Sequence, residues 1–253
     1  MKKTKKAGAI KSETLVNFIL DKSGSMSSVQ DSTISGFNEY VDTLKKDGNK
    51  YSFSLVFFDT EVKQTYNNKP IKEVEKMTRE NYIPDGMTAL YDAVCKTIKD
   101  VQGTVKDNQK VLTVIMTDGE ENSSKEYSQA QLKSLIADME KTGKWSFVFL
   151  GANQDSWANA QKIGVSQMNT SNFAATDAGV KMAMHTMAAN TRAFAGNDLL
   201  ATSAFFSQAD QRNLGGSPQT GMTSNSQDKI SQHFSALGNK SWEARKKKLL
   251  GEE

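Results

Sequence analysis

The sequence contains very little cysteine, histidine and proline: one, two and three residues respectively among 253. The single cysteine, Cys95, excludes an intrachain disulfide and any zinc site built from several cysteines. Because only His185 and His233 could supply imidazole ligands, we expect any metal site to use oxygen ligands. No apolar run approaches the roughly 18 residues that a membrane-spanning helix needs. One cysteine and no recognisable export signal predict a cytoplasmic protein.

The small positive net charge of +3 comes from the ends of the chain. Residues 1–11 hold five lysines and no acid, residues 12–196 hold 20 bases and 23 acids, and residues 197–253 hold seven bases and six acids. Proteins that bind nucleic acid gather Lys and Arg on the fold itself. We therefore expect no nucleic-acid partner, and we interpret residues 1–11 as a basic N-terminal tail.

Four stretches are apolar at nearly every position, which is typical of strands covered on both faces, as in a parallel sheet. They are residues 14–20, 51–58, 111–117 and 145–150. A shorter edge strand is expected around Thr65 and Tyr66, followed by a turn at residues 67–70.

Apolar residues recur at helical spacings of three and four between and after these stretches. The stripes cover residues 34–44, 90–101, 132–139 and 180–191. Ser128 and Gln131 precede the third stripe as a capping box. Strands that alternate with helices predict an α/β fold, doubly wound, with a mostly parallel central sheet flanked by helices. We expect this domain to cover residues 12–196, and residues 197–253 to form a polar C-terminal extension that is partly disordered or helical.

Polar side chains cluster where the predicted strands end. Asp21 ends the first strand and is followed at alternate positions by Ser23 and Ser25, Thr88 precedes a helix, and Asp118 follows the third strand. The carboxyl ends of parallel strands form one edge of a sheet, which is where ligands bind. Two carboxylates and three hydroxyls form an all-oxygen set that suits Mg²⁺, Mn²⁺ or Ca²⁺. Because two acids only neutralise a divalent ion, an open coordination position would favour one more anionic oxygen from outside.

Three motifs carry a resemblance to a known family. The strings DKSGS at 21–25, GMTALYDA at 86–93 and MTDGEEN at 116–122 resemble the motifs of the von Willebrand factor A domain and its metal-ion-dependent adhesion site. The resemblance implies a Mg²⁺ ion surrounded by Asp21, Ser23, Ser25, Thr88 and Asp118. It also implies a protein partner that supplies an Asp or Glu to the metal, in a binding module that is not an enzyme.

Other parts of the sequence bear on that resemblance. The string FLGANQDSW at 149–157 is similar to small intracellular bacterial and phage-type members of the family. Met87 departs from the family pattern, in which Gly or another small residue is common before the threonine. Lys22 lies inside the first motif, at a position where the family usually varies. Neither Met87 nor Lys22 removes one of the five expected ligands.

Several neighbouring residues have simpler interpretations. Ser23 and Ser25 could serve only as turn and cap residues of the following helix. We interpret Asp59 as a turn acid outside the site, and Glu120 and Glu121 as members of a solvated loop on its rim. Asn153 either supports the site or closes a turn. We expect Cys95 to be a small core residue.

Two other functions are open at this point. A magnesium-dependent phosphatase or phosphotransferase similar to the haloacid dehalogenases would use Asp21 as its nucleophile, but it needs a second acid where Ser23 stands. A structural or assembly adaptor of a bacterial or phage complex would use residues 197–253 as an arm. The sequence leaves the oligomeric state and the identity of the partner open.

Overall fold

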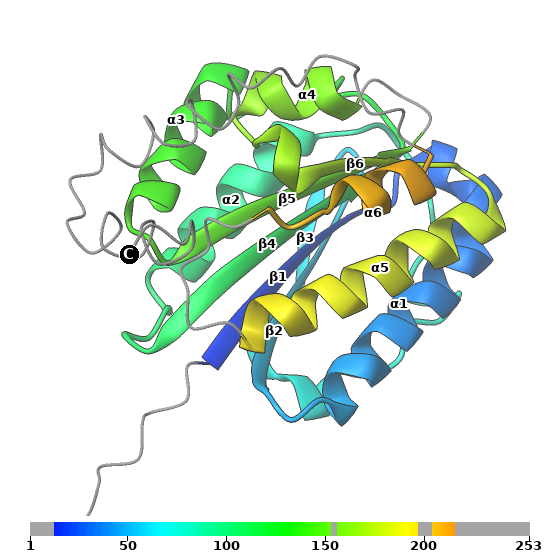
Figure 1. Cartoon of the computed structure of the whole chain (residues 1–253). Coiled ribbons are helices and arrows are strands. Elements are labelled where there is room, and N and C mark those ends of the chain that lie inside the picture. The colour runs from blue at the N-terminus through cyan, green and yellow to red at the C-terminus, as the bar shows by residue number, and fades with distance from the viewer. Residues whose placement is uncertain (1–12, 153–155, 197–203, 216–253) are drawn as a thin grey trace, which may run out of the picture. The chain divides into compact units, whose positions relative to one another are not determined.

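A six-stranded sheet in the order β3-β2-β1-β4-β5-β6 forms the centre of the fold (Figure 1). The computed structural model describes residues 13–152, 156–196 and 204–215. The strands are β1 (Glu13–Asp21), β2 (Lys50–Phe58), β3 (Val62–Pro70), β4 (Gln109–Thr117), β5 (Trp145–Ala152) and β6 (Thr170–Phe173). Every neighbouring pair is parallel except β2 and β3, which are antiparallel. The predicted doubly wound, mostly parallel α/β sheet is confirmed.

Helices cover both faces of this sheet, as Figure 1 shows. They are α1 (Gln30–Lys46), α2 (Leu90–Gln102), α3 (Gln129–Lys141), α4 (Ser156–Ile163), α5 (Asp177–Gly196) and α6 (Gln208–Asn213). The helices α1 and α5 lie side by side on one face, and α2, α3 and α4 lie on the other (Figure 1). The predicted capping box is confirmed, since Ser128 and Gln131 exchange hydrogen bonds at the start of α3.

The apolar stretches of the sequence become strands because both of their faces are buried. Towards α1 and α5, the ring of Phe18 lies 5.6 Å from that of Phe37 and 5.4 Å from that of Tyr40. Its neighbour on β1, Ile19, belongs to the core under α2 and α3. Adjacent side chains on one strand thus enter different cores, which explains the near-continuous apolar pattern. Cys95 is fully buried in the core under α2 and α3, as predicted.

The edge strand differs from its prediction. A strand is present at Thr65 and Tyr66, but the predicted turn at residues 67–70 is wrong, because β3 continues to Pro70 opposite Ser52. The chain accommodates a register shift here: Asn68 has a φ of 50°, and its amide donates a 2.8 Å hydrogen bond to Ser54 Oγ. A bulge of this kind keeps the strand paired while its backbone bends.

Several short elements were missed, β6 and α4 among them, and some predictions concern residues that the structure does not describe. The strand β6 is four residues long and the helix α4 eight, too short for a clear periodic pattern. Beyond residue 196, the side chains of Phe205, Phe206 and Leu214 are buried in the core beside α1 and α5. The basic tail, Asn153 and residues 197–203 and 216–253 of the predicted C-terminal extension lie outside the described residues.

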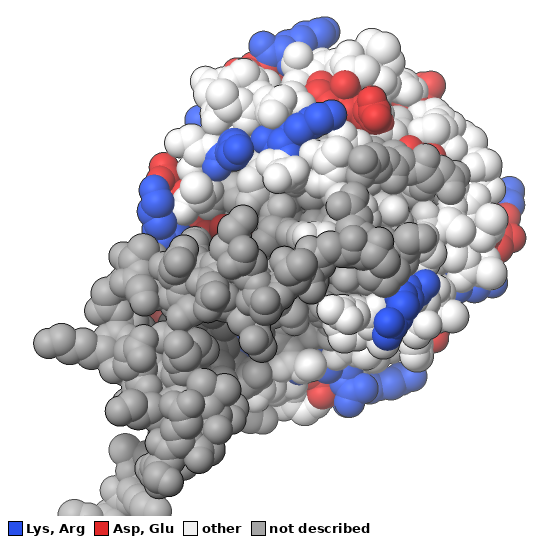
Figure 2. All heavy atoms as spheres, turned by 45° about the horizontal axis from the view of Figure 1, so that its top comes forward, with Lys and Arg blue, Asp and Glu red and all other residues white. Residues whose placement is uncertain are grey.

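Within the described ranges, no helix is both long and apolar enough to cross a bilayer. On the face that Figure 2 presents, the described basic and acidic side chains are interspersed among uncharged ones.

Candidate metal centre

The candidate site lies at the carboxyl end of the central strand β1. The chain passes from β1 to β2 on one side and later returns to β4 on the other, so the strand order reverses at β1. A crevice forms at the carboxyl edge of such a sheet. Asp21 is the last residue of β1 and Asp118 follows β4, and these two strands are paired with Leu20 opposite Met116. The two carboxylates therefore meet at one edge.

The structure brings the five predicted site residues together. Ser25 Oγ donates a 2.6 Å hydrogen bond to Asp118 Oδ1, and the hydroxyl oxygens of Ser23 and Ser25 lie 3.2 Å apart. The backbone amide of Ser23 donates to Asp21 Oδ1 at 2.7 Å. A methyl group placed on Gly119 would lie 2.9 Å from Thr88 Oγ1 and 3.8 Å from Asp21 Oδ2, which brings the threonine to the same point.

The centre has a buried floor and an open lip. Asp21 is fully buried, and Ser23 and Thr88 are 2% and 3% exposed. Ser25 is exposed and Asp118 is partly exposed. A ligand can thus approach from the side of Ser25 and Asp118, while the floor is sealed from water.

Burial strongly affects the first carboxylate. It raises the pKa of Asp21 from 3.8 to about 6, although hydrogen bonds from Thr117 and Ser23 oppose the shift. The nearby negative charge of Asp118 adds to it, and burial also raises the pKa of Asp118. The site therefore holds two anionic groups in surroundings that disfavour their charge.

The donor set fits a hard cation. Carboxylate and hydroxyl oxygens are the ligands that Mg²⁺, Mn²⁺ and Ca²⁺ prefer. In the part of the chain that the structure describes, no group of three His, Cys, Asp or Glu side chains could hold a metal ion. A cation at this centre would thus depend on hydroxyls as well as on the two acids.

Several supporting residues were not predicted. Thr117 Oγ1 donates a 2.5 Å hydrogen bond to Asp21 Oδ2, and the buried hydroxyl of Tyr82 donates to the carbonyl of Asp21 at 2.7 Å. The position of Thr117 at the end of a strand, just before Asp118, could have indicated its role. Tyr82 lies 61 positions from Asp21, so nothing local indicates this contact.

Two loops are tied together around Thr88. Its amide donates to Asn122 Oδ1 at 2.8 Å, and the amide of Asn122 donates to the carbonyl of Thr88 at 3.0 Å.

The interpretation of Glu121 as a solvated rim residue is wrong. Its carboxylate accepts hydrogen bonds from the amides of Tyr91, Ser123 and Ser124 and from the Ser124 hydroxyl. These bonds fix the loop against α2. Glu120 is exposed, as expected.

Asp59 is a turn acid, as predicted. Its Oδ1 accepts a 2.7 Å hydrogen bond from the amide of Glu61, and its Oδ2 forms an ion pair with Lys22. The lysine inside the first motif thus neutralises the neighbouring strand end. Asp59 does not join the cluster formed by the five site residues.

Comparison with known proteins adds a family and a fold. The family model of the von Willebrand factor type A domain matches residues 16–188 of this sequence. No curated protein matches the chain.

Three solved structures illustrate the similarity of fold. Proximal thread matrix protein 1 from the mussel byssus, in the form with a zinc-occupied MIDAS motif, has a TM-score of 0.54 at 14% identity over 72% of this chain and 46% of that one. A von Willebrand factor type A protein from Catenulispora acidiphila has a TM-score of 0.53 at 15% identity, covering 72% and 43%. The vWF domain of the type V pili tip protein Mfa5 from Porphyromonas gingivalis has a TM-score of 0.54 at 10% identity, covering 75% and 98%.

These identities support a shared fold and nothing finer. The chain spans less than half the length of the mussel and Catenulispora chains that it matches.

Proposed function

We propose, since this chain belongs to the von Willebrand factor type A domain family, that it is a protein-binding module that depends on a divalent cation. The ion would be held by Asp21, Ser23, Ser25, Thr88 and Asp118. When bound, it would offer a positive centre to an Asp or Glu side chain of a protein partner. The observation that carries this proposal is the convergence of two carboxylates and three hydroxyls on a site with a buried floor and an open lip.

Charge balance supports an acidic partner group. Asp21 and Asp118 carry at most two negative charges, which a divalent cation neutralises. The hydroxyls of Ser23, Ser25 and Thr88 add oxygen ligands without adding charge. A cation in this set would thus keep an affinity for one external anionic oxygen, and the exposed side of Ser25 and Asp118 leaves room for it.

We propose Mg²⁺ as the natural ion. Mn²⁺ and Ca²⁺ use the same oxygen ligands and are its competitors. Zinc occupies the corresponding motif in a mussel relative, but its usual sites contain Cys or His ligands, and this cluster has neither.

Nothing at the centre favours catalysis over binding. A phosphatase similar to the haloacid dehalogenases would need a second acid two residues after Asp21. That position is occupied by Ser23, whose amide donates a hydrogen bond to the Asp21 carboxylate. We propose a cytoplasmic setting, because the chain has a single cysteine, Cys95, which is free, and so uses no disulfide of its own for stability.

Calorimetric titration of the full chain with Mg²⁺ tests the metal site. We expect one site in the wild-type protein and a loss of binding in Asp118→Asn, because the substitution removes one of the two anionic ligands. Asp100→Asn is the matched control, since Asp100 is exposed on α2, outside the site. Equal binding in all three proteins would contradict the proposed site.

Partner binding is tested separately. Immobilised full-length protein should retain proteins with accessible acidic segments in Mg²⁺ and release them in EDTA. Asp118→Asn should retain none of them in either buffer. Retention that is the same with Mg²⁺ and EDTA would contradict a bridging role for the cation.

A further inference from the structure

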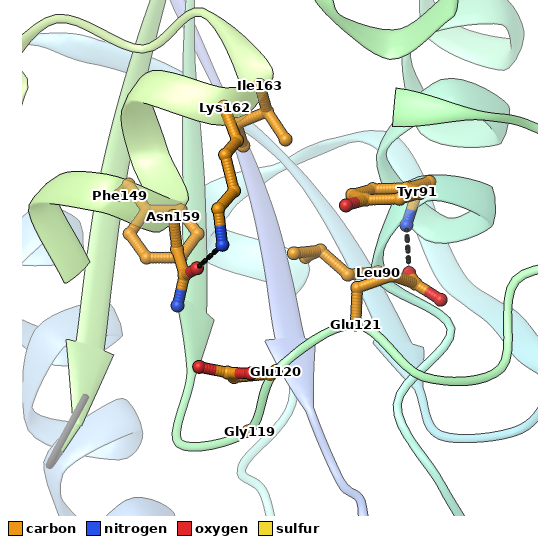
Figure 3. Close-up of a pocket in the computed structure, with 9 residues that line it drawn as sticks. All are labelled: Leu90, Tyr91, Gly119, Glu120, Glu121, Phe149, Asn159, Lys162 and Ile163. Carbon is orange, nitrogen blue, oxygen red and sulfur yellow. Dashed lines mark hydrogen bonds between the residues drawn. The ribbon is translucent and has the colours of Figure 1, made fainter. Parts of the chain in front are cut away.

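A small pocket opens beside the candidate metal centre (Figure 3). It encloses about 70 Å³ between the start of α2, the loop after β4, the strand β5 and the helix α4. Gly119 lines the pocket and follows Asp118 directly in the sequence. Because a Cβ placed on Gly119 would lie 2.9 Å from Thr88 Oγ1 and 3.8 Å from Asp21 Oδ2, this residue borders both the pocket and the candidate metal centre.

The inner wall of the pocket is apolar and fixed. It is formed by Leu90, Phe149 and Ile163, which are 4%, 0% and 1% exposed and belong to the core under α2, α3 and α4. Packed core side chains of this kind do not rearrange freely. The pocket is thus a preformed feature of the fold.

The rim of the pocket carries three charged side chains, Lys162, Glu120 and Glu121. Four donors engage Glu121, so Lys162 and Glu120, which have opposite charges, are the two that a guest can reach. Figure 3 shows the Lys162 ammonium group directed into the pocket from α4, with the Glu120 carboxylate below it on the loop after β4. Lys162 donates a 3.1 Å hydrogen bond to Asn159 Oδ1 and, among the described residues, has no carboxylate within 4.0 Å. Glu120 is exposed and likewise has no cationic partner within 4.0 Å in the described part of the chain. Both charged groups can therefore interact with a guest.

Besides Asn159, which accepts from Lys162, two more polar side chains line the rim, and they play different parts. Glu121 is engaged by four donors of its own loop and of α2. The hydroxyl of Tyr91 faces the pocket in Figure 3. Burial, and secondarily the charge of Glu121, raises the pKa of Tyr91, so this hydroxyl stays protonated and can donate a hydrogen bond. A guest thus meets two donors, Lys162 and Tyr91, and one free acceptor, Glu120.

We infer that the pocket receives a short, uncharged polar side chain, such as that of Asn, Ser or Thr, from the same partner that offers its acid to the metal. The inference rests on the proposed function. An anionic guest would be attracted by Lys162 and repelled by Glu120, and a cationic guest would experience the reverse. A neutral group with both an acceptor and a donor gains from both sides. A space of about 70 Å³, less than half of the roughly 150 Å³ of a cavity that binds benzene, suits a short side chain better than an aromatic one.

Peptide arrays can test this specificity. The probes are acetylated and amidated hexapeptides with one fixed Asp and every other position varied, and the full-length protein is applied in Mg²⁺ and in EDTA. In Mg²⁺ we expect the wild-type protein to favour Asn, Ser or Thr over Ala by about fivefold at one position near the Asp, the usual effect of a hydrogen bond to a charged group.

Two variants should change that preference in opposite directions. Glu120→Gln removes the negative side of the pocket, so acidic residues should become favoured at the same position by about fivefold. Lys162→Gln removes the positive side and should favour Lys there. Both side chains are exposed, so we expect both variants to fold. Lys125→Gln is the control, because Lys125 is exposed and does not line the pocket.

The possible outcomes separate this inference from the proposal on which it rests. Opposite shifts in the two variants, with no shift in the control, support it. Binding that requires Mg²⁺ but shows one preference in all four proteins overturns the inference alone. Binding of no peptide in Mg²⁺, or binding that is equal in EDTA, counts against the proposed function, and the pocket assignment fails with it.

Discussion

The carboxyl ends of β1 and β2 each lead to an aspartate, Asp21 and Asp59, and the two carboxylates differ in burial and in their partners. The strands are neighbours, and Asp21 lies opposite Phe58, the residue before Asp59. Asp59 has a partner for each carboxylate oxygen: the amide of Glu61 and the ammonium group of Lys22. Asp21 is more deeply buried, accepts hydrogen bonds only from neutral groups, and lies near a second acid.

This difference shows why one strand end is structural and the other is a candidate site. The chain itself supplies the cation that Asp59 needs. No Lys, Arg or His of the described residues lies within 4.0 Å of Asp21 or Asp118. A buried acid pair without a counter-charge is unfavourable on its own. A cation from solution would remove that cost.

The largest expected effect is a pH dependence caused by Asp21 in the metal-free protein. Its pKa is about 6 in the folded state against 3.8 ordinarily, so the folded state binds the proton more tightly. This contribution to stability is complete below about pH 4 and is lost as the pH rises through about 6. Two pKa units correspond to about 3 kcal/mol of unfolding free energy. Urea unfolding in EDTA at several pH values measures it.

The two aspartates serve as each other's control in this measurement. In Asp21→Asn, the titrating group is gone, so at pH 7.5 without metal the variant should be more stable than the wild-type protein. Asp59→Asn should keep the wild-type dependence on pH in this range, although it loses its ion pair. If both variants follow the wild-type curve, the burial of Asp21 does not disfavour its charge.

A slightly smaller effect is expected from Mg²⁺ itself. An ion that binds only the folded protein raises the unfolding free energy by about 2.7 kcal/mol when its concentration is 100 times its Kd. We expect this gain in the wild-type protein and in Asp59→Asn, and none in Asp21→Asn. Urea unfolding at pH 7.5 with and without Mg²⁺ measures it, and a gain that survives in Asp21→Asn would place the ion elsewhere.

Much of this arrangement could be predicted from the sequence, because it depends on local patterns. The runs that became β1, β2, β4 and β5 are apolar on both faces, and strand ends of a parallel sheet meet at one edge. The order of the motifs then predicts that Asp21, Ser23, Ser25, Thr88 and Asp118 converge. The clustering observed for these residues agrees with that prediction, whereas metal binding by them stays a proposal.

The rest depends on contacts between distant segments. Glu121 appeared to be one more acid of a polar loop, yet its carboxylate organises that loop through amides that no pattern reveals. Tyr82 likewise reaches Asp21 across 61 positions. The pocket under Lys162 needs α4, which is too short to show a helical period. Long-range hydrogen bonds and short elements leave weak signals in a single sequence.

The next largest effect on the unfolding free energy is expected from a substitution of Gly86, which lies between the ends of β1 and β2. Gly86 has a φ of 71°, its carbonyl accepts from the amide of Gly24, and a Cβ there would lie 2.7 Å from Thr60 Oγ1. Gly86→Ala should lower the unfolding free energy by about 2 kcal/mol, since both backbone and space oppose a side chain. Gly103→Ala is the control, because Gly103 has a helical φ of −74° and no atom within 4 Å of its Cβ position. Equal losses in both variants would show that the constraint at Gly86 is not specific.

The smallest effect should come from Lys22, which neutralises Asp59. The two side chains are 20% and 12% exposed, so their ion pair is only partly screened by water. Lys22→Gln should lower the unfolding free energy by about 1 kcal/mol at low salt, and it should leave the stabilisation by Mg²⁺ in place, because Lys22 does not contact the site carboxylates. A double-mutant cycle with Asp59→Asn isolates the pair. If Lys22→Gln instead removed the response to Mg²⁺, the ends of β1 and β2 would form one functional unit, and their separation into a structural and a binding aspartate would be wrong.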